Sequence, residues 1–260
     1  MRAALAAAAL AAALLPAARA GEPRDLLPDL VQRAPYKLGL ERAGERWRLV
    51  FASAVENHGE GPLLVEGSRR NRATPEMRAD QVVLRSDGST RVVQGVGALR
   101  FVVSSDHRHW HVLGFDRFEL RRAHNFKLLL RDRKTGFCLG DRYAAGPAQD
   151  VVPEFLRTRC GLDRPGLLRV REGITPGFGD DYKPRLEGQY LDVTGLAPGR
   201  YVLTHRANSD GKILESDYGN NAASLLLRLD WEGGEPRLRV LNTCPGAERC
   251  QAPPSELVSE

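Results

Sequence analysis

The sequence predicts an all-β protein with a single antiparallel, sandwich-like domain and long loops. Three observations support this. Trp47, Leu49, Phe51 and Val55 fall on alternate positions, as in a strand with one buried face. The pair Asp87-Gly88 separates apolar runs at 81–86 and 91–94, which is typical of a tight hairpin. Further short apolar runs, most of them divided by turn residues, lie at 101–104, 118–121, 126–131, 190–193, 201–206 and 223–229. Many short strands at such spacing favour a sandwich or barrel, and the only helical signal, a weak one, lies at 153–159.

The first residues have the three-part pattern of a secretory signal. Met1-Arg2 precedes an Ala/Leu run to Leu15, and Ala-Arg-Ala follows at 18–20. We therefore predict a signal peptide over 1–20, a single domain over 21–260 and a secreted or extracytoplasmic location. The apolar run is shorter than the roughly 20 residues that a membrane-spanning helix needs, so no membrane span is expected.

The charge balance does not indicate a nucleic-acid partner. The formal net charge of +5 falls to +3 when Arg2 and Arg19 leave with the signal peptide. The basic residues are interspersed with acidic ones, which is typical of a solvated mixed-charge surface.

Four cysteines in an exported chain indicate two disulfides. Three connectivities are possible, and we predict that near neighbours pair, Cys138 with Cys160 and Cys244 with Cys250. The sequence has no Cys-x-x-Cys spacing, which argues against a cysteine metal site.

Three of the six histidines fall within five residues, at His107, His109 and His111. The two-residue period of a strand would send all three imidazoles to one face. Residues two apart on a strand lie about 6.7 Å apart, so the outer pair reaches one ion only where the strand is twisted or bulged. Converging imidazoles suit copper or zinc, and the spacing alone does not choose between them. The isolated His58, His124 and His205 are interpreted as surface or packing residues.

This triplet resembles the copper-binding His-x-His-x-His run of the lysyl oxidase family, and the resemblance continues downstream in the same order. The segment 134–141 is similar to the one that supplies the lysine of the family's quinone cofactor, and 177–182 to the one that ends in its cofactor tyrosine. Further similar segments lie at 27–30, 189–193, 196–203 and 215–221.

The resemblance implies copper(II) held by His107, His109 and His111, and a lysine tyrosylquinone formed from Lys134 and Tyr182. It implies oxidative deamination of a primary amine to an aldehyde, with ammonia and hydrogen peroxide as the other products. The expected substrate is peptidyl lysine, including lysine side chains of extracellular proteins. Three carboxylates near the tyrosine are candidates for the catalytic base: Asp180, Asp181 and Asp192.

The chain also departs from the animal members of the family. Asp106 stands where they carry a cysteine, and Phe178 and Gly188 stand where a disulfide braces their cofactor tyrosine. Two other functions remain open at this point: a non-catalytic exported adhesion or binding module, suggested by the sandwich-like stretch 195–221, and a redox-inert metal-binding protein.

Overall fold

The computed structural model describes residues 22–105, 108–134, 136–146, 152–156, 158–186 and 188–253, and in these ranges the chain is all-β. The predicted fold class is confirmed. Each pairing between the described strands is antiparallel. Nowhere in these ranges does a helix have the length and apolar character needed to cross a membrane.

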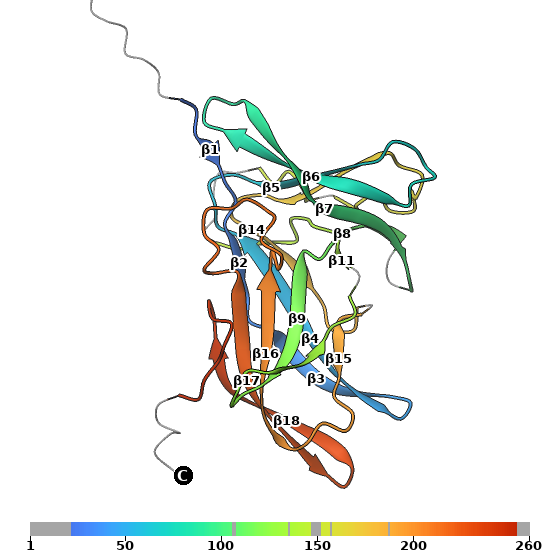
Figure 1. The fold of residues 1–260 in the computed structure, drawn as a ribbon, viewed down its shortest axis with the longest axis vertical. Helices are drawn as coiled ribbons and strands as arrows, with labels where there is room; N and C mark the ends of the chain where they lie inside the picture. The colour runs from blue at the N-terminus through green and yellow to red at the C-terminus, as the bar shows by residue number, and fades with distance from the viewer. Residues whose placement is uncertain are drawn as a thin grey trace, which may run out of the picture.

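A seven-stranded sheet forms one end of the molecule (Figure 1). It contains β1 (Asp25–Leu26), β5 (Leu63–Ser68), β6 (Glu76–Arg85), β7 (Thr90–Val103), β8 (Arg108–Leu113), β11 (Gly136–Phe137) and β13 (Arg169–Ile174). Its strand order is β11-β8-β7-β6-β5-β13, with β1 paired to β6. The histidine-bearing strand β8 is therefore next to the edge, between β7 and the very short β11.

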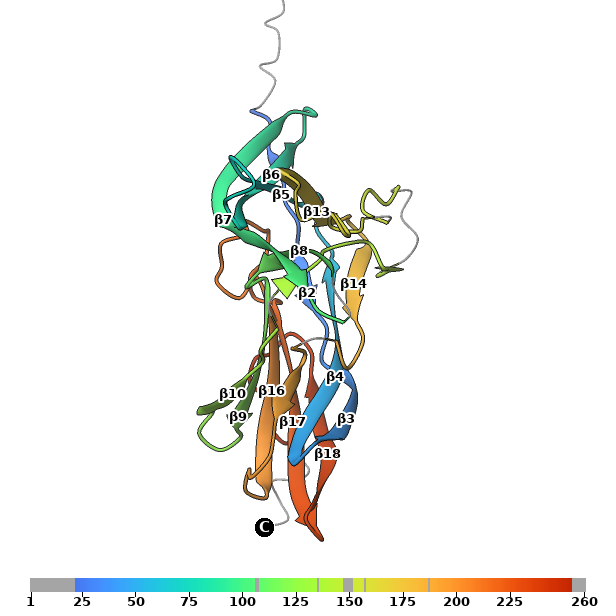
Figure 2. The ribbon, with the colours of Figure 1, turned by 90° about the vertical axis from the view of Figure 1, so that its right-hand side faces the viewer.

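Two further sheets face each other in the rest of the molecule (Figure 2). One contains β10 (Leu128–Arg131), β9 (Asp116–Arg122), β16 (Gly199–Ala207), β17 (Ala222–Glu232) and β18 (Glu235–Cys244), in that order. The other contains β2 (Leu30–Gln32), β3 (Tyr36–Ala43), β4 (Arg46–Asn57), β12 (Tyr143–Ala144), β14 (Phe178–Tyr182) and β15 (Tyr190–Asp192). This pair of layers is the sandwich that the sequence predicted.

Strand β4 differs from its predicted pattern because it is buried on both faces from Leu49 to Asn57. Its polar side chains are paired inside the protein rather than exposed. The Asn57 amide donates to the carbonyls of Gly61 and Ile174, at 3.0 and 2.9 Å. A strand that is buried on both faces can hold polar residues only when they are bonded in this way.

A series of contacting aromatic rings connects the sandwich to the seven-stranded sheet. Phe51 of β4 lies 4.9 Å from Phe118 of β9, and Phe118 lies 6.1 Å from Phe137 of β11, measured between ring centroids. Phe137 in turn lies 4.7 Å from Tyr182 of β14. All three contacts are edge-to-face, the arrangement that ring quadrupoles favour.

The local predictions have mixed outcomes. The hairpin at Asp87-Gly88 is confirmed, with Gly88 at φ +82° between β6 and β7. The weak helical signal at 153–159 is wrong: the described residues of this segment form bends and a turn, with the Glu154 amide bonded to Thr175 Oγ1 at 3.0 Å. Both disulfides are present with the predicted pairing, Cys138–Cys160 and Cys244–Cys250.

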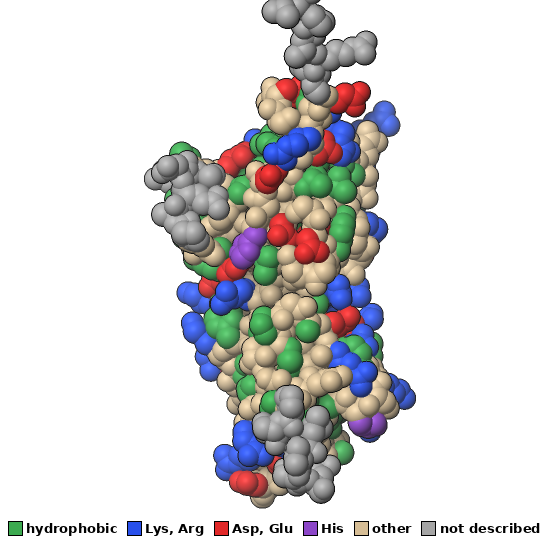
Figure 3. Space-filling view, turned by 90° about the vertical axis from the view of Figure 1, so that its left-hand side faces the viewer, with side chains coloured by type: hydrophobic (Ala, Val, Ile, Leu, Met, Phe, Trp, Pro, Cys, Tyr) green, Lys and Arg blue, Asp and Glu red, His purple; other side chains and the backbone are tan. Residues whose placement is uncertain are grey.

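The surface carries charges of both signs, and basic and acidic side chains are interspersed over the face in Figure 3. Ion pairs such as Arg91–Asp25 and Arg171–Glu66 join different strands of the seven-stranded sheet on this kind of surface. Pairs as exposed as these contribute little to stability and mainly keep the surface solvated.

We expect Leu227→Ala, in the sandwich interior, to lower the free energy of unfolding by about 2–5 kcal/mol, because its side chain is almost fully buried and truncation leaves a cavity. Leu168→Ala is the matched control, since Leu168 is 42% exposed and should lose far less. Urea unfolding of both variants measures the difference. Equal losses would contradict the assignment of the core.

Candidate active site

Strand β8 carries two of the three predicted metal ligands in the described part of the chain. The rings of His109 and His111 lie 4.8 Å apart between centroids, on one face of the strand. His107 lies outside the described residues. Trp110 points to the opposite face, where its indole nitrogen donates to the Arg164 carbonyl at 3.2 Å.

The geometry of the two described histidines fits a metal site. Nε2 of His109 and Nδ1 of His111 are shielded from water, so both rings present nitrogen atoms inside the protein. Among the described residues, no group of three or more His, Cys, Asp or Glu side chains could hold a metal ion. A three-histidine site in this chain therefore needs His107 in addition to the two rings seen here.

Strand β11 pairs with the edge of β8. Gly136 and Phe137 pair with Leu113 and Val112, and a Cβ on Gly136 would lie 2.5 Å from the Val112 carbonyl oxygen. Only glycine allows so close an approach of the two backbones. The chain before β11 is held by Asp132, whose carboxylate accepts from the amides of Lys134 and Phe118, at 2.8 and 2.9 Å.

The structure places Lys134 beside Tyr182. The Lys134 ammonium nitrogen lies 5.5 Å from the centroid of the Tyr182 ring and 5.1 Å from that of Phe137. The two residues predicted to form the cofactor are 48 positions apart in the sequence. The chain around β11 brings them together. Lys134 is half-buried and Tyr182 is buried at 7% exposure, so their contact is largely shielded from water.

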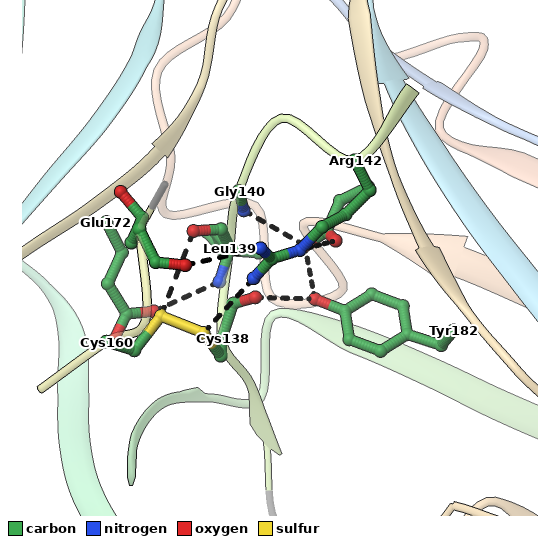
Figure 4. Close-up of a disulfide and its surroundings, with 9 residues drawn as sticks. Cys138, Leu139, Gly140, Arg142, Cys160, Glu172 and Tyr182 are labelled. Atoms are coloured by element: carbon green, nitrogen blue, oxygen red, sulfur yellow. Dashed lines mark hydrogen bonds and ion pairs between the residues drawn. A yellow bond between two sulfur atoms is a disulfide. The ribbon is translucent and has the colours of Figure 1, made fainter. Parts of the chain in front are cut away.

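The hydroxyl of Tyr182 is bonded to two acceptors. One is the backbone carbonyl of Cys138, at 3.1 Å, and the other is Oδ2 of Asp180, at a shorter distance. Figure 4 shows the hydroxyl pointing at the disulfide-bearing segment, between the Cys138 carbonyl and the side chain of Arg142. Burial, together with the neighbouring Asp180, raises the pKa of Tyr182 well above its ordinary value.

The three carboxylates predicted as candidates for the base are in different environments. Asp180 is fully buried, and burial raises its pKa to about 7 although Arg142 acts in the opposite direction. Asp181 is exposed at the rim of a cavity that also holds Tyr36 and Tyr143. Hydrogen bonds from Thr194, more than the ion pair with Arg46 at 3.1 Å, lower the pKa of Asp192. Of the three, Asp180 is the one in contact with Tyr182.

Sequence reasoning missed one buried acid and one arginine near this site. Glu172 accepts from the Leu139 amide at 3.1 Å, and burial raises its pKa well above the ordinary value. Arg142 reaches Asp180 with Nε 3.5 Å from Oδ1. Glu172 occupies an ordinary strand position and Arg142 follows Asp141 in a loop, so no spacing in the sequence marks either residue as functional.

A second buried polar group lies on the other side of Phe118. His205 is fully buried, with Nε2 2.7 Å from Oδ2 of Asp116 and 2.9 Å from the Ser53 hydroxyl. The Gln32 amide donates to its Nδ1 at 2.9 Å and to the Ala54 carbonyl at 2.6 Å. Nδ1 therefore faces an amide donor, and Nε2 faces the Asp116 carboxylate and the Ser53 hydroxyl. The prediction of a packing role for His205 missed these partners.

The fold and the site together define an all-β protein with a pair of histidines and a buried lysine–tyrosine contact at the junction of its sheets. A sequence profile described as lysyl oxidase matches residues 83–236, which is more than half of the chain. The protein therefore belongs to the lysyl oxidase family.

Individual relatives support the same grouping. The chain is 30% identical over 118 residues to human lysyl oxidase homolog 1, a match that covers 45% of this chain and 18% of that protein. It is 28% identical over 121 residues to chicken protein-lysine 6-oxidase, covering 45% and 25%. It is 27% identical over 128 residues to the pig protein of that name, covering 48% and 45%. The matched segment is thus less than half of each relative.

We predict that Gly188→Ala displaces Lys134, because a Cβ there would lie 2.6 Å from the Lys134 Cα and the backbone has φ +73°. Gly195→Ala is the matched control: it has φ +71° but nothing within 4 Å of the added Cβ. The control should lose about 1–2 kcal/mol of unfolding free energy, from the left-handed backbone alone. Gly188→Ala should lose more and expose Lys134 to faster acetylation, measured by mass spectrometry. Equal behaviour of the two variants would contradict the packing of Gly188 against the lysine.

Proposed function

We propose that this protein is an exported copper- and quinone-dependent oxidase of primary amines, with protein lysine side chains as substrates. The observation that carries the proposal is the contact of the Lys134 amine with the Tyr182 ring, 5.5 Å from nitrogen to centroid. Membership of the lysyl oxidase family supports the oxidase class. The names of the protein-lysine 6-oxidase relatives support lysine as the substrate.

The residues of this chain have separate tasks in the proposal. His107, His109 and His111 hold the copper ion, and Lys134 and Tyr182 provide the side chains of the quinone. Bound copper and a tyrosine-derived quinone would supply oxygen activation and the electron sink that ordinary side chains lack. With O₂ as the oxidant and water as the source of the aldehyde oxygen, a primary amine would then be converted to an aldehyde, ammonia and hydrogen peroxide. Asp180 accepts the phenolic proton of Tyr182, because its carboxylate is the acid bonded to that hydroxyl.

Export is supported by one feature of the sequence and one of the structure. The sequence of 1–20 has the pattern of a secretory signal, although these residues lie outside the described part of the structure. The chain also carries two disulfides, and disulfides persist mainly in oxidising compartments.

Copper content tests the metal assignment. We expect about one copper ion per chain in wild-type protein matured with copper, and close to none in His109→Ala after dialysis, because neither neighbour points to the same face of β8. His124→Ala is the control, since His124 is exposed. Elemental analysis gives the result. Equal copper in the His109 variant would remove the triplet from the proposal, and zinc in its place would give a site without oxidase chemistry.

Amine-dependent peroxide tests the cofactor. Tyr182→Phe removes the oxygen at which ring oxidation begins, so peroxide formation and the phenylhydrazine adduct should be lost together. Lys134→Ala should lose most of its activity while copper binding survives. The controls are Tyr190→Phe and Lys127→Ala, which change the same residue types elsewhere in the chain.

Wild-type protein matured with copper and oxygen provides the decisive comparison. Peroxide that depends on added primary amine supports the oxidase. Its absence across several amines, with copper present, would instead favour a binding module or a redox-inert copper protein.

A further inference from the structure

Arg142 lies between the buried tyrosine and a large cavity on the outer side of β14. Its backbone amide donates to the Gly179 carbonyl at 2.9 Å, which fixes it beside the strand. The side chain is 31% exposed and lines a cavity of about 880 Å³. The same side chain reaches inward to Asp180, whose side chain is only 1% exposed. Arg142 thus connects a buried carboxylate to a solvent-accessible space.

The guanidinium is held by several contacts at once. Nε lies 3.5 Å from Oδ1 of Asp180, one terminal nitrogen donates to the Thr158 carbonyl at 3.2 Å, and the other lies 3.5 Å from Sγ of Cys138. Gly140 leaves room for it, because a Cβ at this position would lie 2.9 Å from the Arg142 Cζ. Figure 4 shows the side chain extending over the Cys138–Gly140 segment towards the Cys138–Cys160 disulfide. The charge is therefore positioned by the fold.

The other charged and titratable groups around Asp180 are acids or neutral donors. Tyr182 is hydrogen-bonded to it. The charge of Asp181 raises the pKa of Asp180, and the charge of Asp180 in turn raises the pKa of Glu172. The Gly140 amide donates to Oδ2 at 3.2 Å. Among these neighbours, Arg142 is the one that favours the ionised carboxylate through a positive charge.

The hydroxyl of Tyr182 has a different bonding pattern in each protonation state of Asp180. When Asp180 is ionised, it accepts the phenolic proton. When Asp180 is neutral, its own proton points to the phenol oxygen, and the hydroxyl donates to the Cys138 carbonyl, 3.1 Å away. Proton transfer from the phenol to Asp180 is possible only in the first state.

We propose that Arg142 is a positioning residue that favours the ionised form of the Asp180 carboxylate beside the Tyr182 hydroxyl, so that the phenolic proton can leave when the ring is converted to the cofactor. The inference rests on the proposed function for its catalytic meaning, because the proton transfer matters only if Tyr182 matures. The reaction of this step is limited to the phenol O–H and the carboxylate: one O–H bond breaks and one forms. No other residue on β12 or β14 provides a positive charge at Asp180.

The first test needs neither metal nor quinone. Carbon-13 NMR of aspartate carboxyls in apo protein should show Asp180, assigned by its loss in Asp180→Asn, titrating near pH 7 in the wild type. In Arg142→Gln the midpoint should rise by about one unit, since loss of an adjacent opposite charge disfavours the ionised form. Arg142→Lys should lie between them. Arg159→Gln is the control, because Arg159 is exposed in the same neighbourhood.

The second test follows quinone formation by phenylhydrazine absorbance after copper addition. A rise of one unit leaves about one fifth as much ionised Asp180 at pH 7, so Arg142→Gln should mature about fivefold more slowly there. At pH 9 the two proteins should mature at nearly equal rates, because Asp180 is ionised in both. Such recovery at high pH would not occur if Arg142 only held the fold together, and circular dichroism melting checks the fold directly.

The outcomes separate the two proposals. An unchanged Asp180 midpoint in Arg142→Gln, or a maturation defect that persists at pH 9, would overturn the inference about Arg142 while wild-type quinone formation still supported the function. A shifted midpoint without any quinone in the wild type would support the electrostatic role and overturn the proposed function.

Discussion

The arrangement of the site depends on one short pairing, that of β11 with β8. Two residues, Gly136 and Phe137, bind the edge of the histidine strand, and the missing side chain of Gly136 allows the backbones to meet. The segment is fixed on either side of this contact, by Asp132 before it and by the Cys138–Cys160 disulfide after it. Because both ends are fixed, Lys134 stays near both the histidine strand and the Tyr182 ring.

Several buried acids lie in the interior of the protein. Asp116, Glu172 and Asp180 are all buried, and burial raises the pKa of each. An isolated ionised carboxylate inside a protein is costly, so each needs a proton or a partner. Asp116 is paired with His205, Asp180 is paired with Arg142 and the tyrosine hydroxyl, and Glu172 accepts a hydrogen bond from the Leu139 amide. Their different partners distinguish a structural acid such as Asp116 from Asp180, which is suited to accept a proton.

Much of the site could be predicted from the sequence because its motifs are local. The alternating histidines, the segment around Lys134 and the segment ending at Tyr182 each carry their own pattern, and the order in which they follow one another indicates the family. The fold class followed from strand and turn signals. The full burial of β4 could not be predicted, because it depends on distant segments that cover both faces of the strand.

The residues that were missed depend on contacts between distant segments. Arg142 acts on Asp180 across a gap left by Gly140, and His205 meets Asp116 and Gln32 from three different strands. Nothing in the local pattern around any of these residues distinguishes them from ordinary loop or strand positions. The sequence could only narrow the candidate carboxylates to three near Tyr182. The choice among them likewise needed the directions of their side chains.

The central claim is that Lys134 and Tyr182 become one covalent unit. Peptide mapping of wild-type protein matured with copper and oxygen tests this most directly, by mass spectrometry of a proteolytic digest. The account predicts a single crosslinked species containing the Lys134 and Tyr182 peptides, absent when copper is withheld. Recovery of both peptides in full, unlinked and unoxidised, from copper-loaded protein would contradict it.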